Sequence, residues 1–274
     1  MKIQKVNIND PNFKENFIQS LKETGFAVIS GTSVDQSTVE KVQKNWRSKF
    51  FLQDKNVKLQ YLYNKDDHSG FFPYKSENAK DEEVPDLKEF FHIFKEDHLP
   101  KEIEKDETWE LREKIHKMGL QLLSYIEEDL GVEKDLFQNT VKNCDRTLFR
   151  ILYYPALQGE EQGVRAAAHE DINLITLLPA QSSSGLEAKD SEGNWHSVNY
   201  EAGDIVVNVG DMLQMYTDGA YKSTTHRVSN PNNLNTDRMS MPLFMHPEPD
   251  FDLKKMTAGE YLDQRLKEIL KEKK

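Results

Sequence analysis

The second half of the chain predicts a mainly β protein, a sandwich or jelly roll, with helices flanking it. From Thr147 onward, apolar residues alternate with a period of two, as in residues 148–153. Short apolar runs separated by turn residues follow at 172–179, 185–188, 204–209, 221–228 and 239–245. Many short, evenly spaced strands are typical of sandwiches and jelly rolls.

Residues 1–145 show mostly helical patterns with a few short strands. Asp10-Pro11 predicts a helix start, and Gly25 is a typical helix end. Phe13, Phe17 and Leu21 form the apolar stripe of this first helix. We then expect a strand over 26–29, helices over 35–52 and 101–130, the latter closed by Gly131, and loops with short strands over 60–98.

Residues 257–272 predict a final amphipathic helix, whose apolar side consists of Tyr261, Leu262, Leu266 and Leu270. The sequence has no internal repeat and no low-complexity linker. We therefore expect one domain over 1–274. It would comprise a mostly helical region (1–145), a β core (146–250) and a C-terminal helix (251–274).

Composition narrows the class of protein. The net charge of −11 disfavours binding to nucleic acids or anionic membranes. Cys144 is the only cysteine, which indicates a reducing compartment. No signal peptide or apolar run of membrane-spanning length is evident. We expect a soluble cytoplasmic protein, a monomer, that acts on a small molecule.

The segment His169-Glu170-Asp171 is a candidate metal site. On a strand, residues i and i+2 share a face, so His169 and Asp171 could reach one ion while Glu170 points away. His226, from a later strand, could supply a third ligand. Two histidines and one carboxylate on one face of an octahedron suit non-haem Fe(II), because the remaining positions stay open for reactants.

A second His-x-acid pattern, His246-Pro247-Glu248, is interpreted as a coincidence. Its proline interrupts strand pairing, and no histidine follows it. Arg238 and Ser240 repeat the i, i+2 spacing close after His226. A guanidinium and a hydroxyl on one face are suited to holding a carboxylate.

Together these motifs make the chain resemble the isopenicillin N synthase-like branch of the Fe(II)/2-oxoglutarate-dependent oxygenases. The resemblance lies in the segments 84–91, 147–155, 168–178, 203–211, 223–228 and 237–242. One departure is Leu152, where many plant members carry Asn two residues before the tyrosine that precedes proline. The resemblance implies a double-stranded β-helix (a jelly roll, cupin-like) with flanking helices.

The resemblance also implies an activity. Fe(II), held by His169, Asp171 and His226, would use O2 and 2-oxoglutarate as co-substrates, with ascorbate a candidate reductant. Arg238 and Ser240, with Tyr154, would hold the distal carboxylate of 2-oxoglutarate. Oxidative decarboxylation to succinate would then drive hydroxylation or desaturation of a small organic substrate.

Two alternatives stay open from the sequence. One is an Fe(II) oxidase of the isopenicillin N synthase type, in which Arg238 and Ser240 hold a substrate carboxylate without any oxoacid. The other is a non-catalytic sensor of metal and oxoacid. A zinc hydrolase is less favoured, because Glu170 would point away from the metal face and could not serve as its base.

The substrate site is the least determined feature. Phe72, Tyr74, His92 and Arg165 are candidates for it, with Phe71 beside them. Arg165 could hold an anionic substrate, although a solvated loop arginine is slightly favoured for it. Aromatic runs such as Phe71-Phe72 more often pack than recognise ligands.

Overall fold

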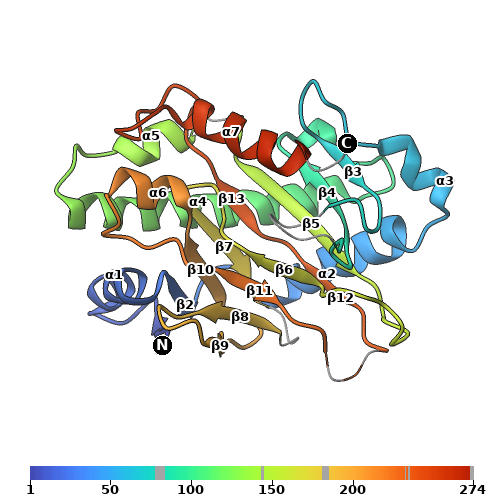
Figure 1. Cartoon of the computed structure of the whole chain (residues 1–274), viewed down its shortest axis with the longest axis horizontal. Helices are drawn as coiled ribbons and strands as arrows, with labels where there is room; N and C mark the ends of the chain where they lie inside the picture. Colours follow the sequence, from blue (N-terminus) through green and yellow to red (C-terminus); the bar gives the residue numbers. More distant parts are fainter. Residues whose placement is uncertain (78–83, 143–144, 181–184, 232, 234, 272–274) are drawn as a thin grey trace.

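The computed structural model describes residues 1–77, 84–142, 145–180, 185–231, 233 and 235–271. Two β-sheets face each other at its centre (Figure 1). The larger has the strand order β1 (Lys5–Asn7), β2 (Phe26–Ser30), β10 (Ile205–Val209), β7 (Ile175–Pro179), β13 (Leu243–Met245), β5 (Leu148–Tyr154), β4 (Glu89–Ile93) and β3 (Gly70–Phe72), with β12 (Arg238–Ser240) also paired to β5. The smaller has the order β6 (Ala166–His169), β11 (His226–Val228), β8 (Leu186–Lys189) and β9 (Trp195–Ser197).

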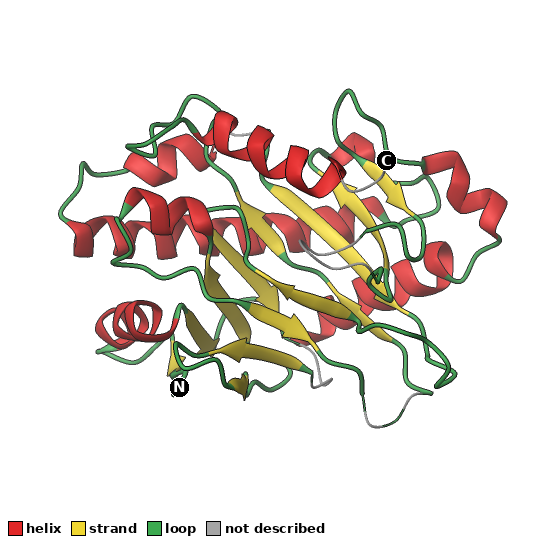
Figure 2. Ribbon diagram, viewed as in Figure 1, coloured by secondary structure: helices red, strands yellow, loops and turns green. Residues whose placement is uncertain are grey.

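Helices flank the larger sheet (Figure 2). Along the chain the described helices are α1 (Phe13–Thr24), α2 (Gln36–Trp46) with its π-helical continuation η1 (Arg47–Phe51), α3 (Lys55–Lys58), η2 (Leu59–Tyr61), η3 (Glu96–His98), α4 (Lys105–Leu130), α5 (Leu136–Lys142), α6 (Asp211–Tyr216) and α7 (Ala258–Lys271). Of these, α1 and α4 pack against the sheet, and α2 and α5 pack on α4. The two facing sheets with flanking helices form the predicted jelly-roll core.

The larger sheet separates two apolar layers. On its outer face, Ile151, Leu177 and Val207 belong to the main core together with residues of α1, α2 and α4. Gly119 lets α4 lie close to β13, because an added Cβ would collide with Met245. The inner face packs against the smaller sheet in a second cluster: Phe26, Val28, Ala180, Leu186, Ala188, Val198 and Val206. Complete burial of one such aliphatic side chain contributes about 1.5–3 kcal/mol.

The predicted helices form, with shifted starts. The first begins at Phe13 and not at Pro11, because the side chain of Asp10 accepts a hydrogen bond from the amide of Asn12 (2.8 Å) in a turn before the helix. The long helix begins at Lys105 instead of residue 101. Both ends are as predicted: Gly25 (φ 72°) and Gly131 (φ 63°) take the left-handed conformation that ends a helix.

Three predicted strands are shorter than expected. The run 172–179 forms a strand only from Ile175, in β7. In the run 221–228, β11 starts only at His226, just after Thr225, whose carbonyl accepts from the amide of Lys189 in β8 (2.9 Å). Side chains provide hydrogen bonds earlier in this run, as where Gln214 accepts from the amide of Ser223 (2.8 Å). The run 239–245 divides into β12 and β13 around Pro242, which has no amide to donate. Five elements were not predicted at all: β1, β9, α3, α5 and α6.

The C-terminal helix packs by its predicted apolar side. Tyr261 is buried, and Leu262 packs partly against the main core. The side chain of Leu270 and all of Cys144 lie outside the described residues. Within the described part of the chain, no helix combines the length and apolar character needed to cross a bilayer.

Candidate metal and oxoacid site

Three side chains converge between the two sheets. His169 is the last residue of β6 and His226 the first of β11, and these antiparallel strands place the two residues directly opposite each other. Asp171 lies two residues beyond β6, in the loop to β7. The conformation of this loop, and not a continuous strand, therefore places its carboxylate near the two histidines. One Asp171 carboxylate oxygen (Oδ1) lies 3.8 Å from Nε2 of each histidine. Ligand atoms of all three lie within 4.8 Å of one another.

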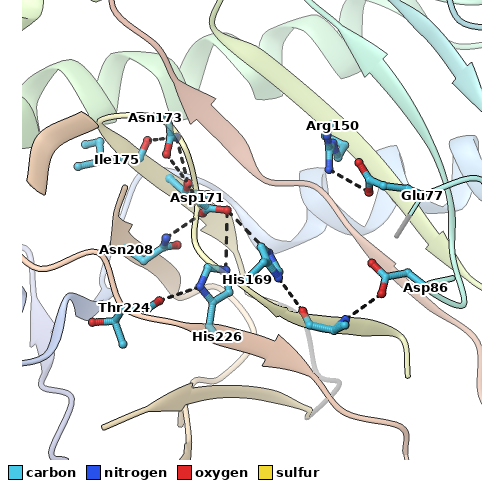
Figure 3. Close-up of polar contacts among 12 residues, drawn as sticks. Glu77, Asp86, Arg150, His169, Asp171, Asn173, Ile175, Asn208, Thr224 and His226 are labelled. Carbon is cyan, nitrogen blue, oxygen red and sulfur yellow. Dashed lines mark hydrogen bonds and ion pairs between the residues drawn. The ribbon is translucent and has the colours of Figure 1, made fainter. Parts of the chain in front are cut away.

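Backbone carbonyls orient both imidazoles (Figure 3). Nδ1 of His169 lies 2.8 Å from the carbonyl of Ala167, and Nδ1 of His226 lies 3.1 Å from that of Thr224. Because a carbonyl only accepts, each Nδ1 carries the proton and each Nε2 keeps its lone pair. This is the usual arrangement of metal-binding histidines. The edge of Phe26 packs against His226, with ring centroids 5.5 Å apart.

The other oxygen of Asp171, Oδ2, accepts two hydrogen bonds. Thr176 on β7 donates from 2.6 Å and Asn208 on β10 from 2.8 Å. Oδ1, which faces the histidines, is thereby left for a metal ion. Thr176 and Asn208 were not among the predicted site residues. Their signal was a polar side chain within a strand that is otherwise apolar.

The local environment keeps these groups deprotonated. Burial, with the neighbouring His226, lowers the pKa of His169 to about 4. Burial by itself would raise the pKa of Asp171, but the two imidazoles and the hydrogen bonds from Asn208 and Thr176 lower it on balance. A metal requires neutral imidazole and ionised carboxylate, and the site offers both at neutral pH.

The predicted carboxylate-binding residues also lie together. Arg238 and Ser240 on β12 pair directly with Tyr154 and Leu152 on β5. Directly paired residues share a face of a sheet, so Arg238 and Tyr154 are neighbours. The Arg238 guanidinium lies 5.2 Å from the centre of the Tyr154 ring. Arg238, Ser240 and Tyr154 are all buried.

The substrate candidates separate into two places. Phe72 and His92 are neighbours, with ring centroids 4.6 Å apart, and Phe72 also stacks on Phe90. Tyr74 is exposed in the loop after β3 and lies against the ammonium group of Lys75. Arg165 does not join them and lies instead beside Tyr154, 5.9 Å from its ring centre. Its exposure is 2%, so the favoured interpretation of a solvated loop arginine is wrong.

A chain of charges borders the metal site (Figure 3). Asp86 accepts from the amide of Ala167 (2.9 Å), two residues before His169. Lys88 joins Asp86 (2.7 Å) to Glu77 (2.8 Å). Glu77 lies 3.7 Å from Arg150, whose guanidinium lies over the Phe90 ring. This series of charged side chains connects β6, the strand of His169, to Arg150 on β5.

His246 is not part of the metal cluster found in the described residues, as predicted. It is buried, and its Nδ1 lies 3.3 Å from the carbonyl of Phe244.

Comparisons with known proteins agree with this geometry. The profile of the 2OG-Fe(II) oxygenase superfamily matches residues 146–247, and that of the N-terminal region of non-haem dioxygenases in morphine synthesis matches residues 4–115. A 2-oxoglutarate-dependent dioxygenase of Didymella fabae is 30% identical over 85% of this chain and 78% of its own length.

Solved structures show the same architecture. A protein of Shewanella oneidensis described as an oxygenase is 36% identical, covers 98% of both chains and superposes with a TM-score of 0.83. A full-length Neurospora crassa protein, solved in complex with alpha-KG, has a TM-score of 0.84 at 23% identity, with 96% of this chain and 95% of that chain covered.

The chain belongs to the 2OG-Fe(II) oxygenase family. Within it, the protein is an Fe(II)/2-oxoglutarate-dependent dioxygenase, an oxidoreductase that requires Fe(II), 2-oxoglutarate and O2 and has a double-stranded β-helix as its core.

Proposed function

We propose that His169, Asp171 and His226 are the Fe(II) ligands. The observation that carries this proposal is the single Asp171 oxygen 3.8 Å from both histidine Nε2 atoms, with the other oxygen held by Thr176 and Asn208. Nitrogen and oxygen donors in this combination fit a divalent transition metal with open coordination positions. When bound, the metal and its co-substrates supply the oxidising chemistry, in which 2-oxoglutarate becomes succinate and the substrate is hydroxylated or desaturated.

We propose that Arg238 and Ser240, assisted by Tyr154, hold the distal carboxylate of 2-oxoglutarate. The guanidinium and the hydroxyl can each donate to a carboxylate oxygen, and burial strengthens such bonds because water is excluded. The protein's contribution is to place the oxoacid and to keep the reacting centre dry.

For the primary substrate, we propose that Phe72 and His92 form part of the binding wall. The pKa of His92 lies well below its usual value because the ring is buried beside Arg150. The ring is therefore neutral, and its Nδ1 lies 3.3 Å from the carbonyl of His68. That contact leaves Nε2 as an acceptor, which suits a substrate hydroxyl or N–H group. Tyr74, which is exposed, would contact only the outer part of a bound substrate.

We also propose a cytoplasmic monomer that forms one domain. A single cysteine is usual in a reducing compartment. Large exposed apolar side chains in the described residues are limited to Leu52, Leu62, Tyr74 and Val84. Light scattering of the purified protein tests the oligomeric state.

The ligand assignment is tested with Asp171→Ala. This variant should bind no stoichiometric Fe(II) and form no succinate, while it unfolds at nearly the same temperature as the metal-free parent. Glu170→Ala is the matched control, because the adjacent carboxylate accepts from Thr225 instead of facing the histidines. Succinate formation by Asp171→Ala at the parental rate would refute the assignment.

A measurement of oxygen uptake with and without 2-oxoglutarate addresses the co-substrate site. Uptake should require the oxoacid and should be lost in Arg238→Met. If Arg238→Met kept its affinity for 2-oxoglutarate, this pocket would not hold the distal carboxylate.

A further inference from the structure

Arg165 is a buried arginine whose position the proposed chemistry does not yet use. It immediately precedes β6, the strand that ends in His169. The pairing of β6 with β11 shifts register between Ala166 and His169, so the spacing alone does not set the direction of Arg165. Its guanidinium lies over the ring of Tyr154, a residue of β5 in the facing sheet, which directs it into the barrel. With 2% of its surface exposed, Arg165 is among the largest fully buried side chains. A charged side chain is rarely buried so completely without a reason.

The contacts of Arg165 leave its charge without a counter-ion in direct contact. Its amide donates to Asn230 (3.0 Å), and one terminal NH2 of the guanidinium donates to the carbonyl of Thr236. Within the described part of the chain, no carboxylate forms an ion pair with Arg165, and its Nε has no hydrogen-bond partner. Asp237, which acts on Arg165 only from a distance, is already paired with Arg47 (2.6 Å). A buried cation in this state is costly unless an anion joins it.

A second guanidinium lies close by. Arg165 and Arg238 both lie over the ring of Tyr154, at 5.9 and 5.2 Å from its centre. Burial and the nearby Arg238 both lower the pKa of Arg165, which reflects repulsion between two cations in a region of low dielectric. The two arginines come from opposite sheets, Arg165 from the start of β6 and Arg238 from β12. A carboxylate received between them would relieve the repulsion.

We infer that Arg165 supplies a second guanidinium to the 2-oxoglutarate site, and that the distal carboxylate of the oxoacid binds to Arg165 and Arg238 together. This inference rests on the proposed role of Arg238. It assigns Arg165 to the binding of the co-substrate 2-oxoglutarate, and no longer to the binding of the primary substrate. The site would then select strongly for oxoacids with a second carboxylate, because the buried cation of Arg165 gains a counter-ion only when that carboxylate is present.

A purely structural role is the competing explanation. By donating to the carbonyl of Thr236, Arg165 could simply fasten the segment that leads into β12. Loss of that bond would change stability, but it would affect all metal-chelating ligands alike. A ligand that chelates the metal and lacks the distal carboxylate therefore separates the two roles.

The test is anaerobic calorimetry on the Fe(II)-loaded protein, with 2-oxoglutarate and oxalate as titrants. Both chelate the metal, and only 2-oxoglutarate carries the distal carboxylate. In Arg165→Met, affinity for 2-oxoglutarate should fall about 10- to 100-fold, as expected for loss of one charge-assisted hydrogen bond, while affinity for oxalate should stay within about twofold. Unchanged affinity for 2-oxoglutarate, or an equal loss for both ligands, would overturn the inference.

Two further variants complete the design. Arg165→Lys keeps the charge and loses the planar fork, so it should weaken 2-oxoglutarate binding by less than Arg165→Met and leave oxalate unaffected. This variant decides the question if Arg165→Met does not fold, and parental affinity for 2-oxoglutarate would then overturn the inference. Arg238→Met separates the two proposals. If it weakens 2-oxoglutarate binding and the Arg165 variants do not, only the present inference fails. If it has no effect, the proposed oxoacid pocket itself is wrong.

Discussion

The two faces of the larger sheet have different roles, although they alternate along the same strands. On β5, Ile151 faces the helices and belongs to the main apolar core, whereas Arg150 and Tyr154 face the barrel interior. On β7 and β10 the same holds: Leu177 and Val207 are core residues, while Thr176 and Asn208 bind Asp171. The period of two thus lets one strand stabilise the fold with one face and build the site with the other.

This comparison predicts that substitutions on the two faces have separable effects. The largest effect is expected from Ile151→Ala on the helical face. Loss of a fully buried isoleucine side chain should lower the free energy of unfolding by about 2–5 kcal/mol. Urea denaturation measures this, with Ile151→Val as a control that should cost about 0.5–1.5 kcal/mol. Turnover per folded molecule should be unchanged, and a selective loss of kcat would contradict the division between the faces.

On the interior face, Thr176→Val should act through the metal. Removal of the hydroxyl that orients Asp171 should weaken Fe(II) binding about 10- to 100-fold, the usual cost of losing such a supporting hydrogen bond. Metal titration of the apo-protein measures the change. Thr176→Ser keeps the hydroxyl and should bind metal nearly as the parent does, so equal affinity in the Val and Ser variants would contradict the proposed role.

A smaller effect is expected from Ser240→Ala, also on the interior face. One hydrogen bond from the hydroxyl to the distal carboxylate is lost, so the KM for 2-oxoglutarate should rise about 10-fold with kcat unchanged. Steady-state assays of succinate formation measure this. An effect on kcat alone would show that Ser240 does not act by binding the oxoacid.

The last prediction concerns the pH dependence of stability, and its residue lies on the helical side. Burial, with Arg112 nearby, lowers the pKa of His116 in α4 from 6.5 to about 4. Between pH 6.5 and 4, His116 is protonated in the unfolded chain and remains neutral in the folded protein. The free energy of unfolding therefore falls as the pH falls through this range. Well above pH 6.5 both states are deprotonated, and the residue contributes no pH dependence.

His116→Leu should therefore reduce the loss of stability of the apo-protein between about pH 7 and pH 5. Urea denaturation at the two pH values provides the measurement. An identical pH dependence in His116→Leu and the parent would show that this histidine is not responsible.

Much of the site was predictable because its chemistry is local in sequence. The His169/Asp171 pair and the Arg238/Ser240 pair each lie within three residues, and their spacing indicates a shared face. Thr176 and Asn208 were missed because a threonine or asparagine within a strand can have many roles. Their role as hydrogen-bond donors to Asp171 becomes visible only when β7 and β10 are seen beside the β6–β7 loop. Arg165 was misjudged for a related reason: its burial depends on β12, which lies far later in the chain.

By itself the sequence determined which residues can ligate a metal, that the second half forms short strands, and the helix ends at Gly25 and Gly131. These features follow from side-chain chemistry and short-range periodicity. Only the tertiary structure decided that His226 lies opposite His169, that Asp171 presents one oxygen to both histidines, and that two arginines share Tyr154. Pairing between strands distant in the chain places those groups, and no local pattern encodes such pairing.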